Sequence, residues 1–428
     1  MNDTTQQKRF DRAVLVGLNA SVLTPEENAT EETMDELAAL LETAGGQCVG
    51  VITQSKDSPD PRTFIGEGKV AEVKQLVQSM DANMVIFDNA LSPSQQRALT
   101  EDLGVSVLDR SALILDIFAQ RARTREGRLQ VELAQYKYLL PRLTGMWTHL
   151  ERQEGAIGTR GPGETQLESD RRHIHRKIAK LEAELKDVRR VRATQRERRI
   201  KNEVPVVAIV GYTNAGKSTL LNAITGADIP ANDRLFDTLD TTTRLLTVSD
   251  TLDVVISDTV GFIRKLPHQL VEAFKATLEE LEYADLLLHV IDASNPEWRE
   301  QARIVDELIR ELGAESIPCI RVYNKCDKAF TAQQEREADA VYLSAKTGEG
   351  IPALLSAVDK KLDKGTKRVV IHLPYDKTGL LDGLYREAKV EKVAYGETVD
   401  VTAVCTPRIM GQLKDYIEGW VEPKEDWE

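Results

Sequence analysis

A phosphate-binding loop is the strongest chemical signal in this sequence. The run GYTNAGKST, Gly211–Thr219, follows an apolar stretch at 204–210 and leads into a helix-like stretch at 219–224. A strand, a glycine-rich loop and a helix in this order aim several backbone N–H groups, and the positive end of the helix, at one point. In such a loop Lys217 would reach the β- and γ-phosphates of a nucleotide, and the Ser218 hydroxyl would bind Mg²⁺. The alternative is an ordinary turn between a strand and a helix.

A second motif, DTVG at 258–261, stands at the end of another apolar strand downstream of the P-loop. The Asp258 carboxylate would hold Mg²⁺, directly or through water. The Gly261 N–H would sense the γ-phosphate, which couples the following loop to hydrolysis. The motif is common by itself, but its position at a strand end downstream of a P-loop makes it specific for a nucleotide site.

A threonine-rich segment, 235–243, lies between these two motifs. One of its four threonines should ligate Mg²⁺ through its hydroxyl and sense the γ-phosphate through its N–H. Thr238 is our choice for this role, and Thr241 and Thr242 are the alternatives.

Two later motifs would bind the base. In the run NKCD, 324–327, the Asp327 carboxylate would accept hydrogen bonds from N1–H and the exocyclic amine of guanine. Adenine has no such pair of donors on that edge, so Asp327 favours GTP over ATP. Lys325 would lie against the base, and Asn324 would tie the motif to the P-loop. In the run SAK, 344–346, a backbone N–H is expected near guanine O6.

The motifs together predict a magnesium-dependent site that hydrolyses GTP to GDP and phosphate by in-line attack of water. The expected catalytic residues are Lys217, Thr238 and Gly261, and the expected Mg²⁺ ligands are Ser218, Thr238 and Asp258. The expected nucleotide-binding residues are Gly211, Asn214, Ala215, Gly216, Lys217, Ser218, Thr219, Asn324, Lys325, Asp327, Ser344, Ala345 and Lys346.

The residue after Gly261 is Phe262, where many GTPases have a glutamine that orients the attacking water. A phenyl ring cannot form that hydrogen bond. We therefore expect slow hydrolysis by the protein alone, with the missing stabilisation supplied by a partner or by another cation.

Alternating strands and helices must position these loops, and the expected fold class is multidomain α/β. Residues 204–365 should form the GTPase domain, a doubly wound sheet with its ligand at the carboxyl ends of the strands. Residues 1–110 read as a small parallel α/β subdomain and 366–428 as a small α+β domain. Residues 111–203 are expected to be an antiparallel helical hairpin.

The hairpin is indicated by two apolar seams with heptad-like spacing, 129–143 and 174–188. A link at 155–163, with four glycines and a proline, separates them and is not expected to continue a helix. The second arm, 171–201, holds 13 basic and 4 acidic residues. This excess favours RNA or another polyanion as the partner, over a plain solvated face.

Composition limits the remaining possibilities. The whole chain has a net charge of −13, so the basic arm stands out against an acidic body. The four cysteines are scattered and have no metal-ligand spacing, and the polar first residues contain no secretory signal. No apolar run is long enough to span a membrane. We therefore expect a cytoplasmic protein. We also expect a monomer, although the sequence does not itself determine whether the chain dimerises.

The chain resembles the HflX family of ribosome-associated GTPases over most of its length. The resemblance rests on motifs inside the GTPase domain and on two outside it that are specific to the family. These are GYTNAGKST, FDTLDTTTR (236–244), DTVGFIRKLPH (258–268), AFKATLEE (273–280), NKCD, LSAKTGEGI (343–351), LDRSALILDIFAQRARTREGRLQVELAQ (108–135) and TRGPGETQLE (159–168).

This resemblance implies GTP-dependent binding to the large ribosomal subunit and its rRNA, and splitting of stalled or stress-inactivated ribosomes. It also implies that the hairpin tip approaches the peptidyl-transferase region. Asn214 resembles the P-loop asparagine of potassium-activated GTPases, where K⁺ supplies the charge of an arginine finger. Two alternatives stay open: a GTPase in ribosome assembly or RNA modification, and a coiled-coil scaffold with a structural nucleotide.

Overall fold

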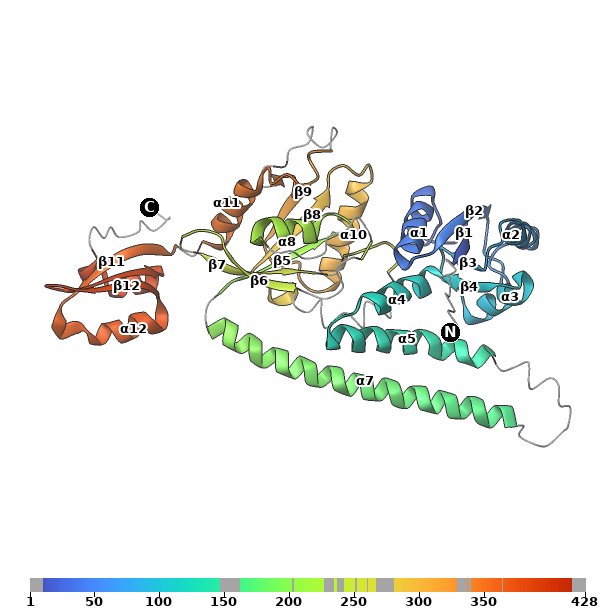
Figure 1. Ribbon diagram of the computed structural model, residues 1–428, viewed down its shortest axis with the longest axis horizontal. Coiled ribbons are helices and arrows are strands. Elements are labelled where there is room, and N and C mark those ends of the chain that lie inside the picture. The colour runs from blue at the N-terminus through green and yellow to red at the C-terminus, as the bar shows by residue number, and fades with distance from the viewer. Residues whose placement is uncertain are drawn as a thin grey trace, which may run out of the picture.

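The computed structural model describes residues 11–146, 162–201, 204–226, 235–236, 242–250, 252–259, 261–266, 281–328, 337, 340–363 and 365–417. The strands form three separate sheets that follow one another along the chain (Figure 1). We call the three parts that carry them the N-terminal unit (11–121), the central unit (204–363) and the C-terminal unit (365–417). Among the described residues, no helix is long and apolar enough to cross a membrane.

The N-terminal unit is a four-stranded parallel sheet in the order β2-β1-β3-β4. Its strands are β1 (Arg12–Ala20), β2 (Gln47–Lys56), β3 (Met84–Phe87) and β4 (Ser106–Asp109), and its helices are α1 (Glu31–Ala44), α2 (Glu67–Ser79), α3 (Pro93–Leu103) and α4 (Arg110–Arg121). This is the parallel α/β arrangement expected from the sequence.

Side-chain caps fix the starts of three of these helices. Thr30, Ser92 and Asp109 each accept a hydrogen bond from a backbone N–H three residues on, which satisfies a donor that the helix itself cannot pair. The apolar face of α4 then packs against α1, and its Ile114 and Phe118 are fully buried. The core that α4 enters also contains Phe236 and Phe262 of the central unit.

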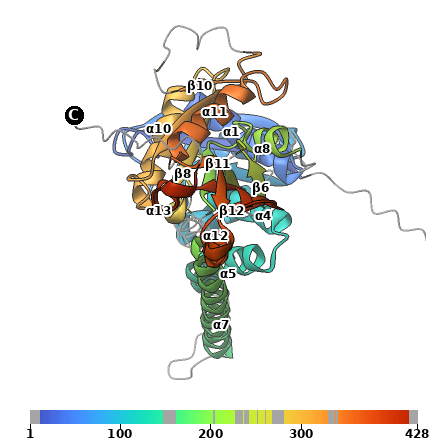
Figure 2. The same cartoon turned by 90° about the vertical axis from the view of Figure 1, so that its left-hand side faces the viewer.

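The hairpin consists of α5 (Arg125–Met146) and α7 (Pro162–Lys201), which run antiparallel below the sheets (Figures 1 and 2). The predicted seam is confirmed, since Leu129 and Leu133 of α5 pack with Leu181 and Leu185 of α7. Most of the expected link lies outside the described residues. The expectation that all of 155–163 is non-helical is wrong at its end, because α7 begins at Pro162. Proline is tolerated at the first helical position, where its missing N–H has no partner to lose.

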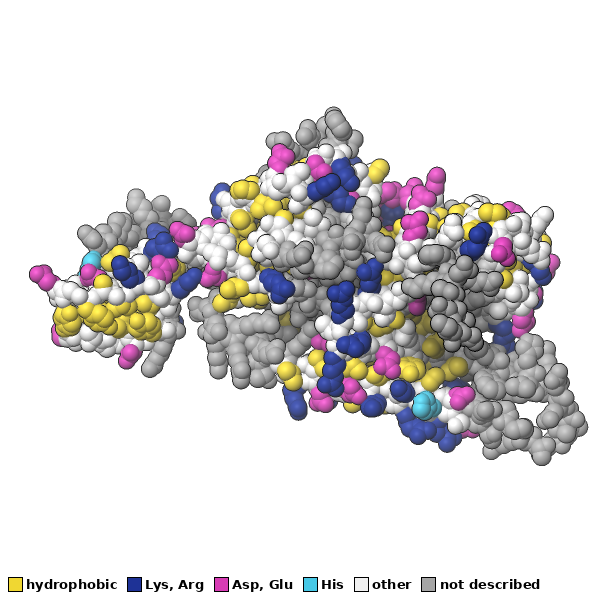
Figure 3. All heavy atoms as spheres, in the orientation of Figure 1, with side chains coloured by type: hydrophobic (Ala, Val, Ile, Leu, Met, Phe, Trp, Pro, Cys, Tyr) yellow, Lys and Arg dark blue, Asp and Glu magenta, His cyan; other side chains and the backbone are white. Residues whose placement is uncertain are grey.

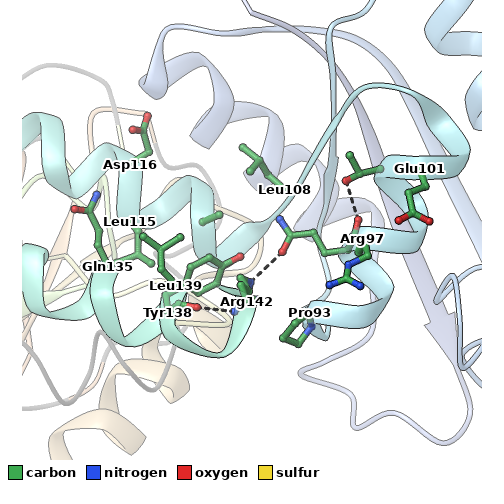
Figure 4. Close-up of a pocket in the computed structure, with 13 residues that line it drawn as sticks. Pro93, Arg97, Glu101, Leu108, Leu115, Asp116, Gln135, Tyr138, Leu139 and Arg142 are labelled. Atoms are coloured by element: carbon green, nitrogen blue, oxygen red, sulfur yellow. Dashed lines mark hydrogen bonds between the residues drawn. The ribbon is translucent and has the colours of Figure 1, made fainter. Parts of the chain in front are cut away.

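Arg142 of α5 fastens the hairpin to the N-terminal unit (Figure 4). Its guanidinium lies 3.5 Å from the centre of the Tyr138 ring and donates to Gln96 Oε1 at 3.0 Å and to Asp109 Oδ2 at 3.1 Å. The Tyr138 hydroxyl also donates to Asp109, at 2.8 Å. Gln96, Tyr138 and Arg142 also line a largely apolar cavity of about 680 Å³ between α3, α4 and α5.

The central unit has a six-stranded sheet in the order β10-β9-β8-β5-β7-β6. All neighbours are parallel except β6 and β7, so the sheet is mixed at one edge. One face packs on α8 and α11, and the other packs on α10. The strands are β5 (Val206–Gly211), β6 (Thr242–Thr247), β7 (Asp253–Asp258), β8 (Leu286–Asp292), β9 (Cys319–Asn324) and β10 (Val341–Tyr342), and the helices are α8 (Lys217–Thr225), α10 (Trp298–Glu311) and α11 (Ile351–Leu362).

The C-terminal unit is a three-stranded antiparallel sheet in the order β11-β13-β12, covered on one face by α12 and α13. Its strands are β11 (Lys367–Leu373), β12 (Lys389–Tyr395) and β13 (Val399–Cys405), and its helices are α12 (Gly379–Glu387) and α13 (Pro407–Gln412). This is the small α+β arrangement that the sequence predicts.

Candidate nucleotide-binding site

The P-loop joins β5 to α8, and its backbone requires glycine at two positions. Gly216 has φ +92°, and a Cβ there would lie 2.3 Å from Asn324 Nδ2. A Cβ on Gly211, the last residue of β5, would lie 2.3 Å from the carbonyl oxygen of Val290. Asn214 is exposed and has φ +61°, a left-handed conformation that asparagine adopts more readily than most residues. The loop therefore packs directly against β8 and the residue that ends β9.

Lys217 lies inside the loop with its ammonium buried. Its Nζ donates to the carbonyl oxygen of Tyr212 at 2.9 Å, and a Cβ on Gly261 would lie 3.0 Å from the same nitrogen. Burial lowers the pKa of Lys217 to about 8, although the nearby Asp258 carboxylate partly offsets that effect. The lysine ammonium therefore lies inside the P-loop, next to Gly261, the predicted γ-phosphate sensor.

The lowered pKa predicts that nucleotide binding takes up a proton at alkaline pH. Below about pH 8 Lys217 is already protonated in the free protein, whereas above it the phosphates must recruit a proton to form the ion pair. The affinity for GDP should thus fall about tenfold between pH 7 and pH 9. Calorimetry at pH 8.5 in two buffers of different ionisation enthalpy should detect proton uptake, and at pH 6.5 none. Binding without proton uptake at pH 8.5 would contradict the assignment.

The two magnesium ligands predicted beside the P-loop are in contact. The Ser218 hydroxyl, in the first turn of α8, donates to Asp258 Oδ2 at 2.7 Å, and the Asp258 side chain is fully buried at the end of β7. A hydroxyl, a carboxylate and phosphate oxygens are hard donors of the kind Mg²⁺ prefers. The described residues contain no cluster of three or more His, Cys, Asp or Glu side chains that could hold a metal by themselves. These donors fit an ion that is bound together with a nucleotide. Thr238 and Thr241 lie outside the described residues, and Thr242 begins β6.

The position of Phe262 gives its side chain no role in orienting the attacking water. Its backbone N–H donates to the carbonyl oxygen of Gly211 at 3.1 Å, and its carbonyl oxygen accepts from Thr213 N–H at 2.7 Å. The side chain is 2% exposed and belongs to the core shared with the N-terminal unit. A buried ring in that position stabilises the packing between the two units. No glutamine stands there to orient the attacking water.

Asn324 connects the segment predicted to bind the base to the P-loop. Its Nδ2 donates to the Ala215 carbonyl oxygen at 2.9 Å, and its Oδ1 accepts from the Ala345 N–H at 2.9 Å. The Ser344 hydroxyl donates to Asp327 Oδ1 at 2.7 Å, which fixes the carboxylate that would read guanine. The motifs of the P-loop, 324–327 and 344–346 therefore meet at one edge of the sheet. Thr219 is half-buried on α8, and Lys346 is exposed.

Two contributors were not anticipated from the sequence. Asp292, at the end of β8, forms an ion pair with Lys325 at 2.7 Å and holds this lysine, whose φ is +62°. The sequence did contain a signal for Asp292, because this carboxylate stands at the end of an apolar strand, as Asp258 does. The second is Tyr212, whose hydroxyl donates to Glu36 of α1 at 2.5 Å and accepts from the Arg264 N–H at 2.9 Å. The P-loop is thereby bound to the N-terminal unit.

A strand, a glycine-rich loop and a helix, joined through Asn324 to the segment that carries Asp327, define the class as P-loop GTPases. Three family descriptions match the chain in order: GTP-binding GTPase N-terminal over residues 31–119, GTP-binding GTPase Middle Region over 121–199, and 50S ribosome-binding GTPase over 206–325. The chain belongs to the HflX family of GTPases.

Relatives with this name cover nearly the whole chain. GTPase HflX of Caldanaerobacter subterraneus subsp. tengcongensis is 48% identical over 95% of this chain and 94% of its own length. GTPase HflX of Escherichia coli is 47% identical over 84% of this chain and 86% of its own. A GTP-binding protein of the archaeon Sulfolobus solfataricus, solved with GDP, is 25% identical over 82% of this chain and 98% of its own, with a TM-score of 0.44.

Replacing Asp327 with asparagine is expected to change the base preference from guanine to xanthine. The amide presents a donor where the carboxylate presents an acceptor, and xanthine carries an oxygen in place of the exocyclic amine of guanine. We expect a loss of GTP affinity of at least about a hundredfold, since the amide donor would face the N1–H and amine donors of guanine and leave them unpaired in the complex. Competition binding with GDP and XDP measures the change. If the variant still prefers GDP over XDP, Asp327 does not contact the base.

Proposed function

We propose that this protein is a GTP-hydrolysing switch that binds the large ribosomal subunit and splits stalled or stress-inactivated ribosomes. The observation that carries the proposal is a continuous set of contacts from the nucleotide site to the basic hairpin. A switch that splits a complex needs such a connection, because the nucleotide state must alter what the hairpin does.

The connection begins at two segments that follow the P-loop in the chain, 235–236 and 263–266. Lys265, four residues after Gly261, donates to the carbonyl oxygen of Asn28 at 3.0 Å and pairs with the buried Asp88 of the N-terminal unit. In the other segment, the ring of Phe236 packs edge-on against Phe118 of α4, with centroids 4.6 Å apart. Both segments would have to respond to the γ-phosphate. The N-terminal unit they contact holds the hairpin through Arg142.

The basic arm supports RNA as the surface that the hairpin meets. Arg171, Arg172, Arg176, Lys180 and Lys186 are exposed on α7, and basic side chains follow this helix in Figure 3. Positive charge along an exposed helix neutralises phosphates and releases counterions, so binding should weaken steeply with salt. The family description 50S ribosome-binding GTPase over residues 206–325 supports the same partner.

For the reaction we propose in-line attack of water on the γ-phosphate. Lys217 and the loop amides would stabilise the charge that develops, and Ser218, Asp258 and Thr238 would hold Mg²⁺ beside the phosphates. The Gly261 N–H would sense the γ-phosphate. Because Phe262 is buried, we propose slow hydrolysis by the free protein and acceleration on the ribosome.

The test is sedimentation of intact ribosomes with the protein and GDP, GTP or a non-hydrolysable GTP analogue. We expect more free subunits with GTP or the analogue than with GDP, and co-migration of the protein with the large subunit. Replacing Arg172 and Arg176 together with glutamine should weaken this binding, while a matched change at the exposed Lys360 and Lys361 of α11 should not. A subunit distribution that is the same with every nucleotide would contradict splitting.

The exposed Asn214 supports a potassium requirement. We expect GTP hydrolysis to be about tenfold or more faster in KCl than in NaCl, because a cation beside the phosphates would supply charge that an arginine finger supplies elsewhere. Phosphate release at equal ionic strength measures this, and Asn214→Ala should remove the difference. Equal rates in the two salts would exclude the role.

We also propose a revised division of the chain. Because α4 packs in the N-terminal core, that part would extend to residue 121 rather than 110, followed by the hairpin to 203, the GTPase domain at 204–365 and the small domain at 366–428. We propose a cytoplasmic monomer. Limited proteolysis with mass spectrometry would locate the boundaries.

A further inference from the structure

A cleft of about 660 Å³ lies between the N-terminal unit and the central unit, away from the phosphate-binding loop. Its walls are the start of α1 with the residues before it on one side and α10 on the other. Its floor includes 263–266, the segment that follows Gly261 and responds to nucleotide in the proposed mechanism. Anything bound here would touch the switch segment directly.

Part of the lining of the cleft is apolar. Ile304 and Leu308 are one turn apart on α10, and both are only partly buried, as is Leu266 of the switch segment. All three pack against the core shared by the two units and keep part of their surface open to the cleft. A helix with an apolar stripe at that spacing is the kind of element that such a groove accepts.

The rim of the cleft is acidic. Among the described residues that line it there are six carboxylates against three cations, and carboxylate side chains gather between α10 and α1 in Figure 3. The carboxylates belong to Glu26, Glu32, Glu297, Glu300, Glu307 and Glu311.

The three cations are already engaged. Arg264 pairs with Glu297, and Lys265 pairs with the buried Asp88. Arg303 pairs with Glu300 at 2.6 Å and also with Glu307. Glu32 and Glu311 remain exposed at opposite walls. A hydrogen bond from the Thr30 hydroxyl holds the pKa of Glu32 below its usual range, so this carboxylate is charged at neutral pH.

We propose that this cleft is the docking site for a basic amphipathic helix of a protein partner. The apolar stripe of that helix would cover Ile304, Leu308 and Leu266, and its lysines or arginines would face the glutamates of the two walls. Charge complementarity selects this occupant. RNA would be repelled by the same rim, so this surface and the basic hairpin recognise different chemistry.

Docking would be coupled to the nucleotide. Arg264 pairs with Glu297, which lines the cleft, and Lys265 pairs with the buried Asp88 of the N-terminal unit, so a change in the segment 263–266 changes the lining of the cleft. A ligand that binds one arrangement better must, by linkage, shift the affinity for the nucleotide that favours it. The partner helix would therefore regulate GTP hydrolysis from outside the phosphate site.

The experiment uses the full chain and a fluorescein-labelled synthetic peptide of about five helical turns, with leucine on one face and lysine on the others. Fluorescence anisotropy should show saturable binding. The double variant Glu307→Gln with Glu311→Gln should bind the peptide about tenfold more weakly, since it removes two rim charges and leaves Arg303 less neutralised. Glu397→Gln, on the exposed surface of the C-terminal unit, is the matched control and should bind like the unmodified protein.

Two further peptides test whether binding depends on the shape of the cleft or only on attraction between opposite charges. A peptide of the same composition without the amphipathic order should bind at least about tenfold more weakly, and a glutamate-for-lysine version should not bind. Equal binding of the reordered peptide, or unchanged binding by the cleft variant, would overturn the proposal.

Exchanging GDP for a non-hydrolysable GTP analogue should change the peptide affinity about threefold or more, and equal affinities would refute the coupling. No ribosome enters these measurements, so they fail or succeed independently of ribosome splitting.

Discussion

Lys217→Ala is expected to lower the rate of GTP hydrolysis by at least about a thousandfold. The lysine ammonium lies inside the P-loop, next to Gly261, and in a phosphoryl transfer it stabilises charge that grows on the phosphate oxygens. Alanine leaves the backbone cradle in place and removes the one buried cation of the loop. GTP binding should also weaken, because the same charge offsets the phosphates in the ground state.

Single-turnover phosphate release measures the chemical step, and mant-GDP fluorescence measures binding separately. Lys360→Ala, an exposed lysine of α11 in the same unit, is the matched control and should behave like the unmodified protein. The ribosome-dependent activities proposed above should disappear with Lys217→Ala. A variant that keeps a tenth of the rate would show that the cradle and Mg²⁺ suffice without this lysine.

Arg110→Met is expected to destabilise the N-terminal unit by about 3–5 kcal/mol, the usual cost of removing one partner from a buried ion pair. The Arg110 side chain is 2% exposed, donates to Asp88 at 2.8 Å and pairs with Glu36. Asp88 is fully buried and also pairs with Lys265 of the switch segment. Without the guanidinium, the two carboxylates would keep only Lys265 as a cation beside them, with the Thr33 and Tyr212 hydroxyls as neutral donors.

Urea unfolding followed by hydrogen exchange at 31–44 and 84–87 would locate the loss, since α1 and β3 carry the two carboxylates. The control is Arg62→Met, which removes the exposed pair with Asp102 and is expected to change stability little. We also expect faster exchange at 263–266 in Arg110→Met, because Lys265 loses part of its anchor. Equal protection in the two variants would mean that the network contributes no net stability.

The sequence predicts how the P-loop, 258–261, 324–327 and 344–346 come together because each motif is local. Each motif is a short run placed by the strand that precedes it, and the carboxyl ends of parallel strands meet at one edge of a sheet. Ser218 and Asp258 therefore come together as their spacing suggests, and Asn324 reaches the P-loop. The hairpin seam follows for the same reason, since heptad spacing fixes which face of each helix is buried. The helix start at Pro162 was missed because glycine and proline mark both a link and a helix beginning.

Only the tertiary structure shows which residues of the N-terminal unit contact the P-loop and the segment 263–266. Tyr212 and Glu36 are 176 residues apart, and Lys265 and Asp88 are 177 apart, so no local pattern pairs them. Phe262 reads in the sequence as a missing glutamine, and only packing against the neighbouring unit shows it as a buried contact. The acidic cleft arises in the same way, from two helices of different units. The residues of each motif are adjacent in the sequence, so their chemistry can be recognised there. The contacts between units form only when surfaces distant in the sequence meet in the folded chain.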